Sequence, residues 1–215
     1  MRNFDGFIFD IDGTLTSTND LIFATFNHVA DKYLNRTFTN QEIIAMFGPT
    51  EDGILTEIMG KDYGAARKDY FKFYTAQHNE MADIYEGIKE VLEIIKSAGL
   101  PLSIYTGKGR DSSLITLEMI GVLDYFDMVV TGDDVKVHKP SPEGIDVFIE
   151  KFNLQRDRVL MVGDAPADIK AARNAGIKNA EVLWDDYAKQ RTHDLQSDFV
   201  FHTVDEFKKF VKSNI

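Results

Sequence analysis

The sequence FIFDIDGT, residues 7–14, lies close to the N-terminus and decides how the rest of the chain is interpreted. Three apolar residues are followed at once by two aspartates one residue apart, and the Gly-Thr pair after them is typical of a turn. The pattern predicts a buried strand with carboxylates at its C-terminal end, where ligands bind in open α/β sheets. Two carboxylates this close repel each other unless a cation lies between them or one keeps its proton. The stretch indicates a divalent metal site or a nucleophile beside an acid/base group; its alternative is ordinary turn chemistry.

Composition and charge exclude several classes of protein and of binding partner. The 215 residues are 44% hydrophobic, enough for one large domain or a core with a smaller module. The absence of cysteine excludes disulfides and thiolate chemistry. The N-terminus lacks the apolar core of a secretory signal, and no segment has the length of a membrane span, so we expect a cytoplasmic protein without a membrane partner. A net charge of −11 disfavours nucleic acid as a partner.

Two patterns of apolar spacing divide the chain. Residues 16–81 show helical spacing, including a capping box formed by Thr39 and Glu42. From residue 85 helices and strands alternate, which predicts a parallel sheet with right-handed crossovers. The strands are expected at residues 101–106, 128–130, 158–164, 181–184 and 198–201, and helices at 111–120 and 166–175, with another beginning at Ser141. We therefore predict an α/β fold in which residues 1–15 and 82–215 form the core and residues 16–81 form a small inserted all-helical domain.

Polar residues follow four of the expected core strands. They are Asp10 and Asp12, Thr106 and Gly107, Lys139 in the loop after the third strand, and Asp164 with Asp168. The carboxyl ends of parallel strands share one edge of the sheet, so residues about 150 positions apart can meet there. Carboxylates, a hydroxyl, a glycine amide and an ammonium are the groups that phosphoryl transfer uses.

These groups resemble, in order and spacing, the four motifs of the haloacid dehalogenase (HAD) superfamily: DIDGT at 10–14, Thr106-Gly107, Lys139-Pro140 and GDAPAD at 163–168. The helical insertion resembles the small helical cap of that superfamily, and FGPT at 47–50 resembles the cap loop of its phosphoglycolate phosphatase-like subgroup. The resemblance covers residues 4 to about 185. It implies a Rossmann-like core, Mg²⁺ and an aspartyl-phosphate intermediate.

Carried over position by position, the resemblance implies a role for each motif residue. Asp10 is the nucleophile, and Asp12 protonates the leaving oxygen and then activates water. The metal is held by the carboxylates of Asp10 and Asp164 and the backbone carbonyl of Asp12. Three further residues complete the set: Thr106 and Gly107 hold the phosphoryl group, Lys139 neutralises it, and Asp168 orients water around the metal.

The resemblance therefore implies a Mg²⁺-dependent phosphatase acting on a small phosphorylated metabolite, either phosphoglycolate-like or a sugar phosphate. Two positions depart from the subgroup, which usually has Asn in place of Gly107 and an acidic residue in place of Ser17. Both departures weaken the case for phosphoglycolate itself. The sequence does not give the oligomeric state.

Other functions fit part of the same pattern. A β-phosphoglucomutase-like phosphomutase would use Asp12 to return the phosphoryl group to the substrate. A receiver-like signalling module also accepts phosphate on a strand-end aspartate, but it needs neither Asp12 nor the insertion. Lys108 and Arg110 can either meet a distal anion of the substrate or lie solvated at the start of a helix, and Asp133-Asp134 is expected to be a solvated turn at the rim of the site.

Overall fold

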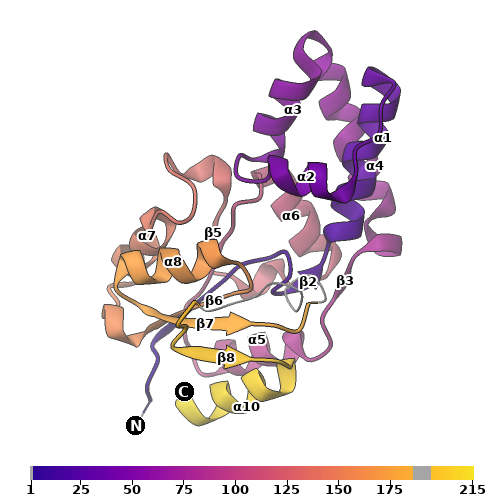
Figure 1. Cartoon of the computed structure of the whole chain (residues 1–215). Helices are drawn as coiled ribbons and strands as arrows, with labels where there is room; N and C mark the ends of the chain where they lie inside the picture. Colours follow the sequence, from indigo (N-terminus) through magenta and orange to yellow (C-terminus); the bar gives the residue numbers. More distant parts are fainter. Residues whose placement is uncertain (1, 186–194) are drawn as a thin grey trace.

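A six-stranded parallel sheet forms the centre of the molecule in the computed structural model, which describes residues 2–185 and 195–215 (Figure 1). The strand order is β5-β4-β1-β6-β7-β8, and every neighbouring pair is parallel. The strands are β1 (Gly6–Phe9), β4 (Leu102–Tyr105), β5 (Met128–Val130), β6 (Val159–Gly163), β7 (Lys178–Val182) and β8 (Phe199–Phe201). The predicted α/β fold with a parallel sheet is confirmed.

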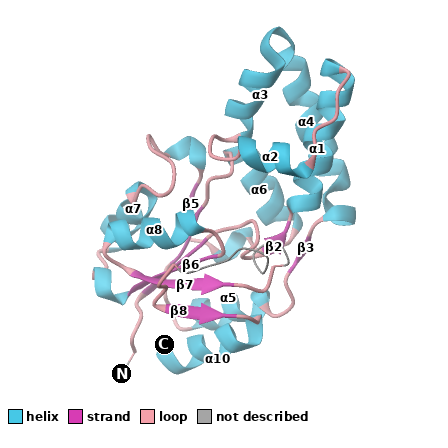
Figure 2. Ribbon diagram, in the orientation of Figure 1, coloured by secondary structure: helices cyan, strands magenta, loops and turns pink. Residues whose placement is uncertain are grey.

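The central strand β1 supplies side chains to both faces of the sheet. Phe7 and Phe9 point to one hydrophobic cluster, which the helices α5 and α10 cover, whereas Ile8 points to another, which α7 and α8 cover (Figure 2). A strand that is buried on both faces must be apolar throughout, which explains its uninterrupted hydrophobic run. The core helices are α5 (Ile88–Ser97), α6 (Arg110–Met119), α7 (Glu143–Phe152), α8 (Pro166–Ala175) and α10 (Val204–Asn214).

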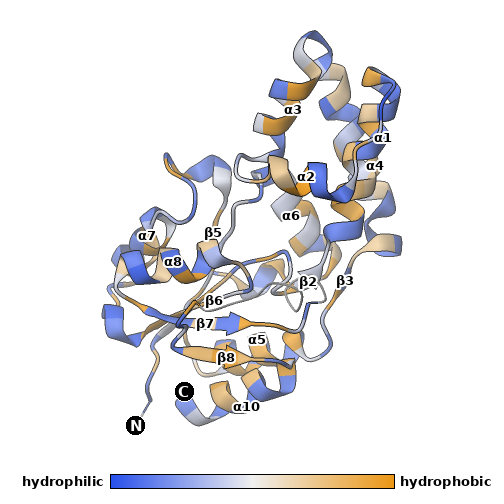
Figure 3. Ribbon diagram, viewed as in Figure 1, coloured by the Kyte–Doolittle hydropathy of each residue, from blue (hydrophilic) through white to orange (hydrophobic). Residues whose placement is uncertain are grey.

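A helical insertion follows β1 and has a hydrophobic cluster of its own. Its helices are α1 (Asn19–Leu34), α2 (Asn40–Met46), α3 (Glu51–Met59) and α4 (Tyr63–Met81). Phe26 of α1, Leu55 of α3 and Tyr70 of α4 are among the side chains buried in that cluster. Each of these helices carries both hydrophobic and hydrophilic residues, as expected for helices with one buried face (Figure 3). The helical insertion that the sequence predicts is thus confirmed, and the capping box of Thr39 and Glu42 is present.

Two short strands connect the insertion to the core. β2 (Thr16–Ser17) pairs antiparallel with β3 (Asp83–Ile84). The hydroxyl of Thr16 donates to the backbone oxygen of Asp83 at 2.6 Å. This bond links the segment that enters the insertion to the segment that leaves it. The first two residues of the predicted all-helical segment are therefore strand.

The structure differs from the sequence-based expectation in three other elements. The strand predicted at 181–184 lies at 178–182, because the buried Asn179 exchanges hydrogen bonds with Asp198 and so tolerates a position inside the sheet. The helix expected to contain Pro142 begins after it, at Glu143. The helix α10 is not predicted, although Thr203 and Glu206 form a capping box directly before its buried face.

Helix length also bears on membranes. Within residues 2–185 and 195–215, no helix is both long enough and apolar enough to cross a bilayer.

Candidate active site

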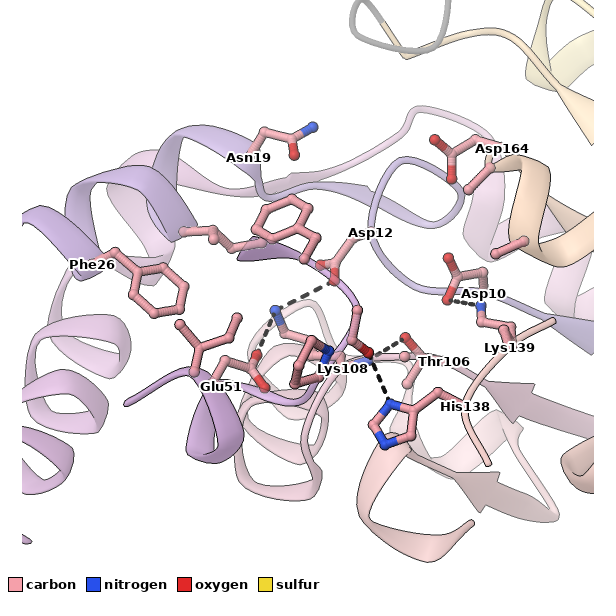
Figure 4. A pocket seen from close by; sticks show the side chains of 18 residues that line it. Asp10, Asp12, Asn19, Phe26, Glu51, Thr106, Lys108, His138, Lys139 and Asp164 are labelled. Atoms are coloured by element: carbon pink, nitrogen blue, oxygen red, sulfur yellow. Dashed lines mark hydrogen bonds and ion pairs between the residues drawn. The ribbon is translucent and has the colours of Figure 1, made fainter. Parts of the chain in front are cut away.

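The carboxyl ends of three neighbouring strands bring predicted site residues together. Asp10 follows β1, Thr106 follows β4 and Asp164 follows β6, and all three side chains are buried. They line a cavity of about 240 Å³ between the sheet edge and the insertion. Lys139 lines it too, beside Asp10 in Figure 4. We refer to Asp10, Thr106, Lys139 and Asp164 as the carboxylate end of the cavity.

Lys139 balances the negative charge of this end. Its Nζ lies 3.1 Å from Oδ1 of Asp10 and 2.5 Å from Oδ1 of Asp168. It also donates to the backbone oxygen of Tyr105 at 3.1 Å. Burial alone would lower the pKa of Lys139, but the two carboxylates more than offset it and raise the pKa above its ordinary value. The side chain is therefore held as a buried ammonium against the predicted nucleophile.

Three buried carboxylates at the sheet edge can hold a metal ion. One oxygen from each of Asp10, Asp164 and Asp168 lies within 4.8 Å of the others. Hard divalent cations bind such oxygen donors. Burial raises the pKa of Asp168 to about 6, against the opposing effect of Lys139. A cation among these carboxylates would favour their charged forms and so lower this pKa.

Two glycines make this close approach possible. Gly13 has a φ of +78°, and a Cβ at this position would lie 2.7 Å from the carboxyl group of Asp164. A Cβ on Gly163 would lie 2.4 Å from the carboxyl group of Asp168. Real Cβ atoms essentially never approach another heavy atom this closely, so both positions favour glycine.

Asp12 lies apart from the three-carboxylate cluster and is held by different partners. The hydroxyl of Thr18 donates to its Oδ1, and Nζ of Lys108 lies 3.4 Å from its Oδ2. Burial raises the pKa of Asp12, although the charge of Lys108 works against the rise. A carboxyl group whose pKa is raised keeps its proton to higher pH, as a general acid must. The structure thus separates the two aspartates of the DID motif into two environments.

Lys108 and Glu51 form a buried ion pair that the sequence does not predict. Nζ of Lys108 lies 3.4 Å from Oε1 of Glu51, the first residue of α3, and the lysine side chain is only 2% exposed. Of the two alternatives for these residues, the structure excludes a solvated helix start for Lys108, whereas Arg110 is exposed and pairs with Asp134 at 2.7 Å. Asp133 accepts from the backbone N–H of Arg110 at 2.7 Å, so this turn caps the start of α6. The sequence signal for Lys108 is its place directly after the Thr-Gly motif.

The insertion supplies the other end of the cavity. Ile22, Phe26, Phe47 and Ile54 line it with apolar side chains; we refer to these four residues as the apolar end. Figure 4 shows Phe26 and the carboxylate of Glu51 on the side of Asp12 that faces away from Asp10. The cavity therefore has a charged end made by the core and an apolar end made by the insertion, with Asp12 between them.

Thr106 and Gly107 lie at the floor of the cavity, where the sequence places a phosphoryl-binding pair. The hydroxyl of Thr106 accepts from the backbone N–H of Lys108 at 3.3 Å, which orients it within the loop. A Cβ on Gly107 would meet nothing within 4 Å. The structure brings the predicted residues together, and their individual roles stay predictions.

Comparisons with known proteins agree with the geometry. The family described as "Haloacid dehalogenase-like hydrolase" matches residues 7–182. The chain is 33% identical over 199 residues to the pyrophosphatase PpaX of Bacillus velezensis, covering 93% of this chain and 92% of that one.

Solved structures show the same fold. A predicted phosphoglycolate phosphatase from Haemophilus somnus superimposes with a TM-score of 0.86 over 98% of this chain and 99% of that one, at 20% identity. CbbY from Rhodobacter sphaeroides, in complex with phosphate, superimposes with a TM-score of 0.83 over 95% and 96% of the two chains, at 17% identity. Because the family match covers residues 7–182, most of the chain, this protein belongs to the haloacid dehalogenase-like hydrolases.

Proposed function

We propose that the chain is a Mg²⁺-dependent phosphatase that hydrolyses a small phosphate monoester through an aspartyl-phosphate on Asp10. The observation that carries this proposal is the carboxylate end of the cavity, where a buried carboxylate lies 3.1 Å from the ammonium of Lys139 and close to Thr106. A nucleophile, a cation and a hydroxyl donor in one cavity are the groups that phosphoryl transfer to an aspartate needs.

The metal proposed here is Mg²⁺, held by the carboxylates of Asp10 and Asp164 and the backbone carbonyl of Asp12. The buried carboxylates of Asp10, Asp164 and Asp168 fit this ion because they are hard oxygen donors gathered within 4.8 Å, and the ammonium of Lys139 lies against two of them, Asp10 and Asp168. When bound, Mg²⁺ supplies charge neutralisation for the phosphoryl oxygens. Asp168 already accepts hydrogen bonds from Lys139 and from the Ala165 backbone N–H, and it would orient water at this site.

In the proposed reaction, the two aspartates of the DID motif have different roles: Asp10 is the nucleophile, and Asp12 is the general acid and base. An oxygen of Asp10 attacks phosphorus, the bond from phosphorus to the alcohol oxygen breaks, and Asp12 gives that oxygen a proton. Asp12 then takes a proton from a water molecule, whose oxygen attacks phosphorus and displaces Asp10 as a free carboxylate with release of inorganic phosphate. The raised pKa of Asp12 supports the first of these proton transfers.

We further propose that residues 16–81 act as a cap over a core of residues 1–15 and 82–215. Contacts between the insertion and α6 support this arrangement. The hydroxyl groups of Tyr74 and Thr116 are hydrogen-bonded at 2.7 Å, and Arg67 forms an ion pair with Asp111 at 2.6 Å. A cap held in this way excludes water from the aspartyl-phosphate.

A second candidate is hydrolysis of pyrophosphate, in which phosphate replaces the alcohol as the leaving group. The similarity to the Bacillus velezensis pyrophosphatase favours it. The chemistry at Asp10 would be the same, so the two candidates differ in what occupies the apolar end of the cavity.

The test of the proposed function is phosphate release from a panel of esters and pyrophosphate, with Mg²⁺ or EDTA. We expect Mg²⁺-dependent turnover that Asp10→Asn abolishes, while Asp124→Asn, which changes an exposed carboxylate in the same way, keeps it. An Asp10-linked phosphate that persists without turnover would contradict the proposal and favour a receiver-like module. Return of the phosphoryl group to a sugar phosphate would favour a phosphomutase.

A further inference from the structure

Positive charge reaches the cavity through two ammonium groups. Among the described residues that line the cavity, the lysine and arginine side chains are those of Lys108 and Lys139. Lys139 lies against Asp10 and Asp168 at the carboxylate end. Lys108 is thus the remaining ammonium that a leaving group beyond Asp12 can meet.

Glu51 is built into the loop that carries Lys108. One oxygen of Glu51 accepts from the backbone N–H of Gly109 at 2.6 Å, and the other accepts from the hydroxyl of Ser112 at 2.6 Å. A Cβ on Gly109 would lie 2.6 Å from the glutamate oxygen, so the glycine makes room for it. The side chain of Glu51 is only 8% exposed. These contacts fix the charge of Glu51 beside Lys108.

The charge of Lys108 is therefore balanced by carboxylates before a substrate binds, although its Nζ makes no hydrogen bond within the described part of the chain. Its Nζ lies 3.4 Å from both Glu51 and Asp12. Even when Asp12 carries a proton as the general acid, Glu51 alone balances the ammonium. A leaving group with its own negative charge would face a buried carboxylate and no unmatched cation, in a place of low dielectric constant where such charges interact strongly.

The remaining walls of this end favour an uncharged group. Phe26, Ile22 and Ile54 offer no hydrogen-bond donor to an anion, and the side-chain amide that the insertion adds to the lining, that of Asn19, carries no charge. Transfer of a phosphate or carboxylate from water to such a surface is unfavourable, whereas a small alcohol can bury its carbon atoms there.

We propose that Glu51 is a specificity-determining residue, which neutralises Lys108 and thereby directs the site to phosphate esters of small uncharged alcohols and against anionic leaving groups. The inference rests on the proposed function and names its substrate class. It places pyrophosphate and phosphoglycolate among the poor substrates of this chain.

The experiment compares two esters of nearly equal size, 2-hydroxyethyl phosphate and 2-phosphoglycolate, with pyrophosphate as a third substrate. For the wild-type protein we expect kcat/KM to be at least about tenfold higher for the uncharged alcohol. In Glu51→Gln the preference should fall about tenfold, because the amide keeps the shape of the side chain but removes the charge that balances Lys108. Glu57→Gln makes the same change at an exposed position of α3 and should leave the ratio unchanged.

A second variant decides the question if Glu51→Gln does not fold, as judged by its thermal melt. Lys108→Met removes the ammonium instead, so it should move the preference in the opposite direction, further toward the uncharged ester. A wild-type preference for phosphoglycolate or pyrophosphate would overturn the inference and leave the phosphatase proposal standing, as would equal ratios in all variants. Absence of phosphate release from every substrate would instead overturn the proposed function.

Discussion

The two ends of the cavity are held together by different parts of the molecule. At the carboxylate end, Asp10 and Asp164 come from neighbouring strands of one sheet, and Lys139 lies 3.1 Å from Asp10. Beside the apolar end, Glu51 comes from the insertion and Lys108 from the core, and they meet at 3.4 Å. The carboxylate end is fixed by the backbone of the sheet, whereas the Glu51–Lys108 pair forms only where the insertion contacts the core. We therefore expect changes at the first end to affect the reaction itself and changes at the second to affect selectivity and pH dependence.

The largest effect should follow from a change in the three-carboxylate cluster. Asp164→Asn removes one of its charges, so phosphate release should fall at least about a hundredfold. The wild-type melting temperature should rise on addition of Mg²⁺, because the ion binds the folded state, and the variant should lose most of that rise. Thermal melts with Mg²⁺ and with EDTA measure it. An unchanged response to Mg²⁺ would place the metal elsewhere.

The next prediction compares two alanine substitutions along the same edge of the sheet. Gly163→Ala places a Cβ 2.4 Å from the carboxyl group of Asp168 and should destabilise the protein by about 1–3 kcal/mol, with a loss of activity. Gly107→Ala meets nothing within 4 Å and should change stability by less than about 0.5 kcal/mol. Urea unfolding of both variants measures the loss in the free energy of unfolding that each substitution causes. Equal losses would show that glycine is not required at position 163.

Lys108→Met should have a smaller effect, on the pH dependence of the reaction. The charge of Lys108 opposes the rise in the pKa of Asp12, so its removal should raise that pKa further. An acid with a higher pKa holds its proton to higher pH, and the decrease of kcat/KM at alkaline pH should begin at higher pH than in the wild type. A pH profile measured with a neutral-alcohol ester checks this. If the alkaline decrease of kcat/KM instead began at lower pH in the variant, the assignment of Asp12 as the acid would be contradicted.

The smallest effect is expected at the opposite end of β1, which serves as a reference outside the cavity. Ion pairing with Arg158, and also with Arg2, lowers the pKa of Asp5 to about 2 from an ordinary value of 3.8. The stability that this pair contributes is present above pH 3.8 and is lost as the pH falls toward 2. Because the pair is partly exposed, Asp5→Asn should remove no more than about 1 kcal/mol at neutral pH, with unchanged kcat/KM. The free energies of unfolding of the wild type and of Asp5→Asn should be measured at several acidic pH values. The difference between the two proteins should vanish at the lowest pH.

The carboxylate end was largely predictable from the sequence, because the carboxyl ends of parallel strands share an edge. Asp10, Thr106 and Asp164 each follow an apolar run that reads as a strand, so their meeting follows from the topology alone. The resemblance to a known family then assigns each a role, and these roles stay predictions.

The apolar end was not predictable in the same way. Glu51 has the appearance of an ordinary acidic residue in the first turn of a helix, and nothing local indicates that it reaches α6. The contact depends on how the insertion packs against the core, which no short-range pattern records. The displaced strand β7 has a similar cause, since Asn179 is acceptable in the sheet only through its bonds to Asp198, 19 residues away.

The ribbon of β2 and β3 has a consequence for how this molecule can be varied. The chain leaves the core at Thr16 and returns at Asp83, and these residues lie on two paired strands. The insertion is therefore joined covalently to the core through one pair of adjacent chain segments, much as a hairpin turn would be. A different helical unit whose ends lie equally close can replace residues 18–82 without changing the strand order of the sheet. The entropy lost on closing the chain at this point is small. In this architecture one sheet edge can be combined with different helical units, each bringing its own residue to the position of Glu51.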